Sequence, residues 1–150
     1  MIKVNIFKEG AKLPDKISET YIGKIVKKTA SECSKDKISV ALIFCSNDYI
    51  KDINKKFRKK NYPTDVLSFP ETDEPFPFEK KSYQNIGEIY ISVDKAIEQA
   101  EEFGVKIRDE LTRLVIHGFL HLIGYDHEKS KAEEKKMFKK EEEILNTLNG

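Results

Sequence analysis

The chain has 150 residues, of which 39% are hydrophobic and 35% are charged, and its formal net charge is +1. This length suits one domain over residues 1–150 with its own core, and the near-zero charge does not by itself demand a polyanionic partner. The longest strongly apolar run, Val40 to Cys45, is far too short to cross a bilayer, and residues 2–7 alternate like a strand rather than a signal peptide. We therefore expect a cytoplasmic protein with no membrane partner. The two cysteines, Cys33 and Cys45, form no Cys-x-x-Cys pair, which favours reduced thiols.

Hydrophobic periodicity and helix-end signals predict a chain of mixed strands and helices. The predicted strands cover residues 2–7, Lys37–Cys45, Asp65–Phe69 and Ile86–Ser92. The predicted helices run from Asp15 to about Ser34, from Ser46 or Asn47 to Phe57, from Val93 to Phe103, from about Ile107 to Ile123, and from a cap at Ser130 to about Leu148. The loop from Pro70 to about Asn85 is the candidate for a mobile flap. We expect an α+β fold: a single domain with one mixed β-sheet of about four strands packed with helices.

Positive charge is concentrated in one short segment. Residues 51–60 hold five lysines and Arg58 against the single acid Asp52. This excess of positive charge could bind the phosphate groups of a nucleic acid, although a solvent-exposed helix face explains it equally well.

The strongest chemical signal is the spacing of the histidines. All three, His117, His121 and His127, occur in one segment with the pattern H-x-x-x-H-x-x-G-x-x-H. A four-residue step on a helix returns to nearly the same face with a rise of about 6 Å, so His117 and His121 can converge on one ion. Gly124 is where a left-handed turn would end the helix and bring His127 back as a third ligand. The alternative is that the histidines are packed in the helix with their polar atoms satisfied.

This spacing is the ligand skeleton of metzincin zinc peptidases with one difference. Those peptidases carry a glutamate base after the first histidine, where this chain has Gly118. Three neutral imidazoles leave a divalent ion its full charge and an open coordination position, as in catalytic zinc sites. The sequence thus predicts one zinc ion per chain, on a central helix, without the peptidase base.

Three segments, Asn54 to Pro70, Ile86 to Ser92 and His117 to His127, resemble the YbeY family of rRNA maturation factors. The histidine segment is similar to that family's H-G-x-L-H-L-x-G-Y-D-H, and Phe57-Arg58 followed by Pro63-Thr64-Asp65-Val66-Leu67-Ser68-Phe69-Pro70 is similar to its second motif. Two departures lie after the arginine, where Lys59 and Asn61 replace the family's usual Gly and Asp. A third is Glu88, where the family usually has Asp.

The resemblance implies His117, His121 and His127 as zinc ligands and Arg58 as the functional arginine. A planar guanidinium binds phosphate oxygens in pairs, but an arginine after a helix can also cap carbonyls or pair with an acid. Glu88 has three possible roles: a base for the attacking water, a partner that orients an imidazole, or an exposed strand acid. We favour the partner role, because ligating imidazoles usually donate their second N–H to an oxygen.

The resemblance also implies a function. It indicates a single catalytic domain that acts as a zinc-dependent, single-strand-specific endoribonuclease in maturation of the small-subunit rRNA 3′ end and in ribosome quality control. The implied partners are single-stranded rRNA or its precursor and the ribosome or its small subunit. Two alternatives remain: a non-catalytic ribosome-assembly factor stabilised by its metal, and a metzincin-like peptidase. The sequence does not predict the oligomeric state.

Overall fold

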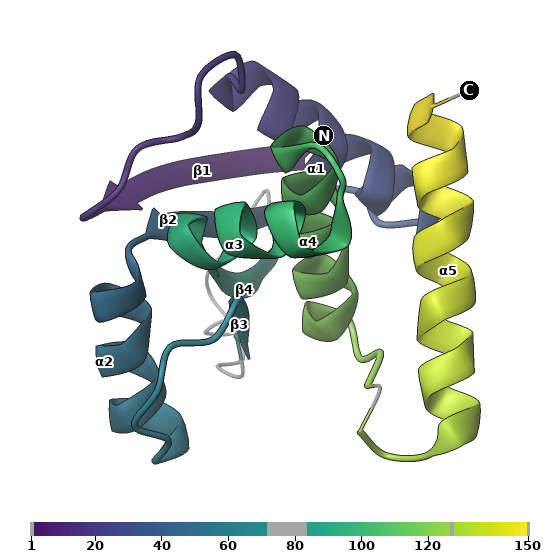
Figure 1. Cartoon of the computed structure of the whole chain (residues 1–150). Helices are drawn as coiled ribbons and strands as arrows, with labels where there is room; N and C mark the ends of the chain where they lie inside the picture. The colour runs from purple at the N-terminus through teal and green to yellow at the C-terminus, as the bar shows by residue number, and fades with distance from the viewer. Residues whose placement is uncertain (1, 72–83, 127, 150) are drawn as a thin grey trace, which may run out of the picture.

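A computed structural model describes residues 2–71, 84–126 and 128–149 of the chain. These residues form four strands and five helices (Figure 1). The elements are β1 (Ile2–Glu9), α1 (Glu19–Glu32), β2 (Ile38–Cys45), α2 (Asn47–Arg58), β3 (Val66–Pro70), β4 (Gln84–Ser92), α3 (Val93–Phe103), α4 (Ile107–Leu122) and α5 (Lys131–Asn149).

The strands form one mixed sheet, as predicted. Their order is β1-β2-β4-β3, with β1, β2 and β4 parallel and β3 antiparallel to β4. The inner strand β2 is apolar except for Ser39, because most of it is buried on both faces. Its alternate residues enter different cores, with Leu42 and Phe44 in the larger one and Ile43 and Cys45 in the smaller one.

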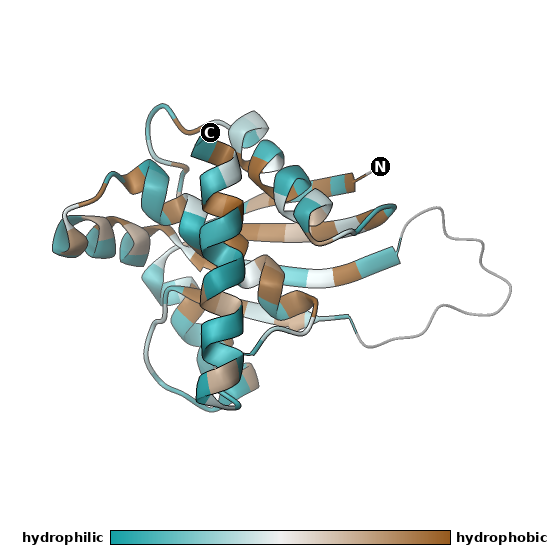
Figure 2. Cartoon of the chain, turned by 90° about the vertical axis from the view of Figure 1, so that its right-hand side faces the viewer, coloured by the Kyte–Doolittle hydropathy of each residue, from teal (hydrophilic) through white to brown (hydrophobic). Residues whose placement is uncertain are grey.

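The two faces of the sheet are covered by different helices. The larger core joins the sheet to α1, α3, α4 and α5, and the smaller core places α2 against the opposite face through Ile50 and Tyr49. Helix α5 lies on the outside, where most of its surface is hydrophilic (Figure 2). Helix α4 is the most deeply buried, since it packs against α1, α3, α5 and two strands. This is the central helix that carries the first two histidines.

Most predicted element ends are confirmed within two residues, but α1 begins later than predicted. Lys16 has a left-handed backbone (φ 68°), and Ile17 N–H donates to the Pro14 carbonyl at 3.1 Å. The chain therefore turns before the helix, and Ser18 caps it by accepting from Tyr21 N–H at 3.1 Å. The predicted cap at Ser130 is confirmed, because its Oγ accepts from Glu133 N–H at 3.1 Å.

The predicted loop from Pro70 to Asn85 is shorter than expected. Gln84 and Asn85 belong to β4, where Gln84 pairs with Ile38 of β2. Residues 72–83 lie outside the described residues, so the predicted flap stays a prediction.

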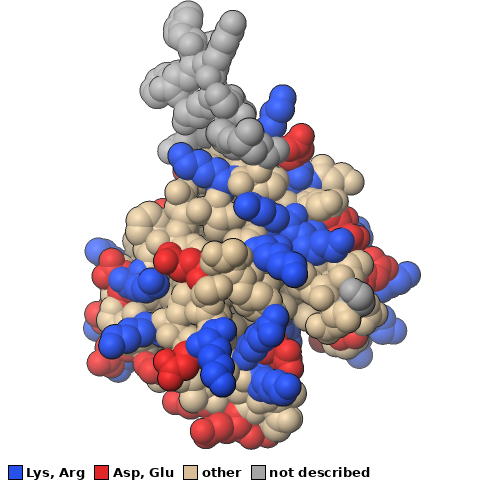
Figure 3. All heavy atoms as spheres, turned by 90° about the horizontal axis from the view of Figure 1, so that it is seen from above, with Lys and Arg blue, Asp and Glu red and all other residues tan. Residues whose placement is uncertain are grey.

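The described helices include none that is long and apolar enough to span a bilayer. The surface of the described residues has no large region of a single charge on the face seen from above in Figure 3, where basic and acidic side chains are interspersed. Both cysteines, Cys33 and Cys45, are free thiols, and of the two only Cys45 is buried.

Candidate functional site

Helix α4 places His117 and His121 on one face, one turn apart. Their ring centroids are 4.7 Å apart, and the rings meet edge to face at 73°. The helix ends at Leu122, and Gly124 has a positive φ of 108°, the region that favours glycine. The predicted turn after the second histidine is therefore present. His127, the third predicted ligand, lies outside the described residues.

A carboxylate from another helix contacts the first histidine. The Nδ1 atom of His117 is hydrogen-bonded to Oε1 of Glu141, which belongs to α5 and is 8% exposed. An oxygen at Nδ1 favours the tautomer whose other nitrogen, Nε2, carries the free lone pair. No chemical motif marks Glu141 in the sequence, although the residue lies at helical spacing between Met137 and Ile144, the buried apolar residues of α5.

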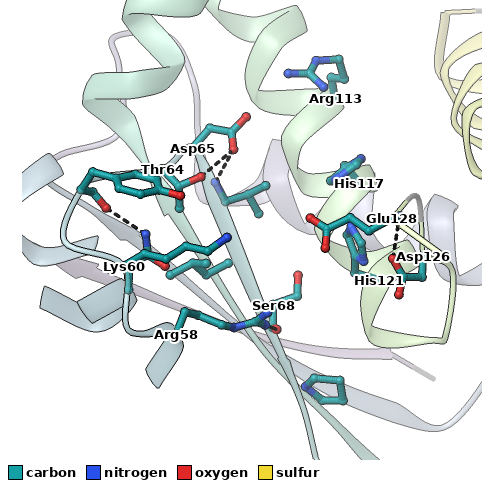
Figure 4. Close-up of a pocket in the computed structure, with 15 residues that line it drawn as sticks. Arg58, Lys60, Thr64, Asp65, Ser68, Arg113, His117, His121, Asp126 and Glu128 are labelled. Atoms are coloured by element: carbon teal, nitrogen blue, oxygen red, sulfur yellow. Dashed lines mark hydrogen bonds between the residues drawn. The ribbon is translucent and has the colours of Figure 1, made fainter. Parts of the chain in front are cut away.

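The two histidines line a hollow of about 550 Å³, which we call the histidine cleft. In Figure 4, side chains from the end of α2 and from the segment into β3 face those of α4 and the turn after it. The lining residues are Asn54, Arg58, Lys60, Tyr62, Thr64, Asp65, Val66, Leu67, Ser68, Pro70, Arg113, His117, His121, Asp126 and Glu128. The structure thus brings together Arg58, His117 and His121 from segments far apart in the sequence.

Arg58, the last residue of α2, is anchored at the edge of the cleft by residues of β3. Its Nη2 donates to the Ser68 carbonyl at 3.0 Å, and its guanidinium carbon lies 5.2 Å from the centroid of the Phe69 ring. Lys59, which follows it, has the left-handed conformation (φ 58°, ψ 31°) that glycine favours. The α2 helix therefore turns sharply after Arg58 even though a lysine replaces the family's usual glycine.

Glu88 is not brought to the histidines. In the antiparallel ladder, Ser68 pairs with Ile89 and Phe69 pairs with Glu88. Ser68 and Ile89 face α4, because the Ser68 hydroxyl donates to the Gly118 carbonyl at 3.0 Å and Ile89 packs against Gly118. Glu88 therefore lies on the opposite face, where its carboxylate accepts from the Tyr90 hydroxyl at 2.8 Å. Of the three roles considered for Glu88, its position matches an exposed strand acid, and the imidazole partner seen among the described residues is Glu141, on His117.

Gly118 faces the sheet rather than the cleft. A Cβ atom at this position would lie 2.6 Å from Cγ2 of Ile89 and 3.3 Å from Oγ of Ser68. Close packing of α4 on β3 and β4 thus requires glycine here. A glutamate at this position, as in the peptidases, would point toward the strands and not toward the histidine face.

Further charged groups surround the histidines. Arg113 lies one turn before His117 and is held in place by the buried Glu110, to which its Nε and Nη2 donate at 2.8 and 2.9 Å. These hydrogen bonds raise the pKa of Arg113, so the group stays charged. On the far side of His121, Asp126 accepts from Glu128 N–H at 2.8 Å through Oδ1, the turn hydrogen bond typical of aspartate.

The described part of the cleft fits part of a metal site. Within residues 2–71, 84–126 and 128–149, no three His, Cys, Asp or Glu side chains come together as a complete metal-binding group. His117 and His121 nevertheless lie side by side, and His117 has the carboxylate partner that ligating imidazoles usually have. Imidazole nitrogen is a donor that zinc and related divalent ions accept.

Comparisons with known proteins agree on one family. The family model described as Endoribonuclease YbeY matches residues 4–149. Among the relatives, Endoribonuclease YbeY of Bacillus licheniformis is 44% identical over 95% of this chain and 92% of its own length. That of Persephonella marina is 39% identical over 88% of this chain and 84% of its own length. A Thermotoga maritima protein with a known solution structure is 34% identical, with a TM-score of 0.64 over 97% of this chain and 87% of that one. On this basis the chain belongs to the endoribonuclease YbeY family.

Proposed function

We propose that this chain is a zinc-dependent endoribonuclease that cuts single-stranded rRNA, in particular during maturation of the small-subunit rRNA 3′ end and in ribosome quality control. The observation that carries the proposal is the histidine cleft, in which Arg58 on one wall faces His117 and His121 on the other. Residues 1–150 would form its single catalytic domain. The names of the relatives support cleavage of RNA as the reaction.

Arg58 would bind a phosphate of the RNA strand. A guanidinium group offers several N–H donors in one plane, an arrangement that matches phosphate oxygens. Only one of these nitrogens, Nη2, is needed for the hydrogen bond to the Ser68 carbonyl, so the same group can be held in place and still donate to phosphate oxygens. Lys60 lines the same cleft and adds positive charge beside it.

His117, His121 and His127 would hold one zinc ion. When bound, zinc supplies Lewis acidity, which makes water a better nucleophile at neutral pH and withdraws charge from a phosphate oxygen. Glu141 would accept the Nδ1 proton of His117 and so keep Nε2 available as the ligand atom. Glu88 would take no part in this chemistry, since it lies on the other face of the sheet.

The implied partners are an rRNA or its precursor and the ribosome or its small subunit, in the cytoplasm. The basic segment from Lys51 to Lys60 supports a polyanionic partner, because its last residues enter the histidine cleft. Phosphate binding and catalysis would thus use adjacent groups.

A non-catalytic assembly factor is the alternative that one observation favours. The contact between His117 and Glu141 joins α4 to α5, so a metal on the histidines would also support the packing of these helices. Melting curves with and without a chelator separate the two functions. A catalytic site predicts a small loss of thermal stability with complete loss of cleavage, and a structural site predicts unfolding. The peptidase alternative is disfavoured by Gly118, which faces the sheet.

Cleavage of a single-stranded rRNA fragment tests the proposal. Wild type and His121→Ala, purified in parallel, would be assayed after chelation and after zinc is added back, with the duplex form of the same fragment as a comparison. The proposal predicts zinc-restored cutting of the single strand by wild type alone. Equal cutting by both proteins would indicate a contaminating nuclease and would refute it.

A further inference from the structure

An exposed aromatic side chain lies beside the phosphate-binding groups of the histidine cleft. Tyr62 is 52% exposed and lines the cleft together with Arg58 and Lys60. It belongs to the short connection between α2 and β3, in which an exposed tyrosine adds nothing to either hydrophobic core of the described residues. Its exposure therefore calls for an explanation other than packing.

The backbone that carries Tyr62 is held by a buried amide. Asn54 on α2 is only 2% exposed, and its Nδ2 donates to the Tyr62 carbonyl at 2.8 Å. The backbone carbonyl of Asn54 also accepts from Lys60 N–H at 3.3 Å. Burying a polar amide is costly unless its hydrogen bonds are made. Asn54 thus ties the connection to the helix at two points and fixes where Lys60 and Tyr62 stand.

The neighbours of Tyr62 complement the chemical groups of a nucleotide. Arg58 and Lys60 are cations that bind phosphate, and an aromatic ring within the same cleft can stack on the base of the same strand. Sites that bind single strands combine these two elements, a basic groove and aromatic stacking surfaces.

We propose that Tyr62 is a nucleobase-stacking residue of the histidine cleft, positioned by Asn54 beside Arg58 and Lys60. This inference rests on the proposed function and adds a reason for single-strand specificity. A base can stack on a side chain in this way only when it is unpaired and turned away from its own helix. A paired base would leave Tyr62 without a partner, so a duplex would lose this part of the binding free energy.

Binding of RNA strands with a single abasic site tests the inference. Affinities of the full-length protein would be measured by fluorescence anisotropy in the presence of EDTA, with the abasic site moved stepwise along a short single strand. For wild type and Tyr62→Phe, we expect one position at which loss of the base weakens binding about 5- to 150-fold, the range for one stacked base. For Tyr62→Ala, that penalty should fall below about 2-fold. Phe103→Ala removes another exposed aromatic ring, at the end of α3 and outside the cleft, and should keep the full penalty.

The role of Asn54 has its own readout. Asn54→Asp preserves size but replaces the N–H donor with an acceptor that faces the Tyr62 carbonyl. It should reduce the abasic penalty in the wild-type background and change nothing further in the Tyr62→Ala background, because a positioning residue acts through its partner. Equal weakening in both backgrounds would show that Asn54 does not act through Tyr62.

The outcomes separate this inference from the proposed function. A penalty that persists in Tyr62→Ala, or that is missing in wild type, overturns the inference even if wild type cuts RNA with zinc. A loss of affinity at the abasic position that depends on Tyr62 supports the inference even if no cleavage is found. In that case the proposed function alone would fail. Absence of any RNA binding by wild type in EDTA would overturn the inference, while the cleavage assay with zinc would still decide the proposed function.

Discussion

His117 on α4 and Glu141 on α5 are joined by a hydrogen bond between Nδ1 and Oε1. Both side chains are largely buried, and Glu141 lies among the apolar residues that attach α5 to the rest of the fold. A carboxylate in such a place is costly unless it has a partner. The position of Glu141 is therefore explained by the histidine rather than by the packing of α5 alone.

Removing the charge of Glu141 should weaken metal binding. Glu141→Gln keeps the shape of the side chain but is a poorer acceptor for the Nδ1 proton of His117. Loss of such a partner typically lowers metal affinity about 10- to 100-fold. Competition with a chelator for zinc measures the effect, and Glu143→Gln, a change at a more exposed carboxylate of the same helix, is the control. Equal zinc affinity in both variants would refute the role given to Glu141.

Replacing Arg58 should slow cleavage while zinc still binds. Arg58→Ala removes a charged donor group worth about 1.5–3 kcal/mol, so kcat/KM for a single-stranded RNA should fall about 10- to 150-fold. Arg58→Lys restores the charge without the planar fork and should recover only part of the rate. Lys55→Ala removes a positive charge from an exposed position of the same helix and should stay within about 3-fold of wild type. If Lys55→Ala and Arg58→Ala lose the same rate, general charge explains the effect and a specific site does not.

Two glycines in helices should respond oppositely to alanine. Gly118→Ala places a methyl group 2.6 Å from Cγ2 of the buried Ile89, and such overpacking costs about 1–3 kcal/mol. The melting temperature should fall by about 3–10 °C. Gly23→Ala in α1 meets no atom within 4 Å and should stabilise the protein by about 0.5–1 kcal/mol, since alanine is the better helix former. A Gly118→Ala protein as stable as wild type would show that α4 does not pack this closely on the sheet.

Alkaline pH should destabilise the protein in part through Cys45. Burial raises the pKa of this thiol from 9.0 to about 12. The folded state therefore keeps a proton that the unfolded chain releases above about pH 9, and the free energy of unfolding falls as pH rises from there toward the folded pKa. Between about pH 8 and about pH 10.5 the contribution is about 2 kcal/mol.

Urea unfolding of wild type and Cys45→Ala at these two pH values isolates the thiol. Tyr90, whose pKa is also raised by burial and by its hydrogen bond to Glu88, is common to both proteins. The variant should be less stable at the lower pH because of the cavity, and its decline with pH should be shallower. Parallel declines would mean that Cys45 does not carry the effect.

Local sequence patterns predict most of the elements and the placement of His117 and His121 on one face of a helix. The spacing of His117, His121 and Gly124 depends on one helix and its end, so the sequence contains the whole signal. Alternation in β4 likewise placed Glu88 and Tyr90 on one face and Ile89 and Ile91 on the other. Alternation does not predict which face of the sheet α4 covers, and a role for Glu88 beside an imidazole depends on that face.

The remaining parts of the site depend on contacts between distant segments. Glu141 is one of many charged residues in α5, a helix rich in Lys and Glu. Its burial depends on how α5 packs on α4, which the sequence of α5 alone does not predict. Asn54 and Tyr62 are hydrogen-bonded across a turn in which Lys59 has a left-handed backbone. Lysine rarely adopts this conformation, so the sequence does not predict the turn. The roles of these residues depend on tertiary contacts, and hydrophobic periodicity does not predict such contacts.

A zinc titration of the metal-free protein tests the central claim most directly. Cleavage of a single-stranded rRNA fragment would be followed while zinc is added in steps to chelated and dialysed wild type and His121→Ala. We predict that the wild-type rate rises linearly and reaches its maximum at one zinc per chain, while the variant stays inactive at every concentration although it is folded. Full cleavage by metal-free wild type, or equal cleavage by His121→Ala, would contradict a catalytic metal on the histidines of α4.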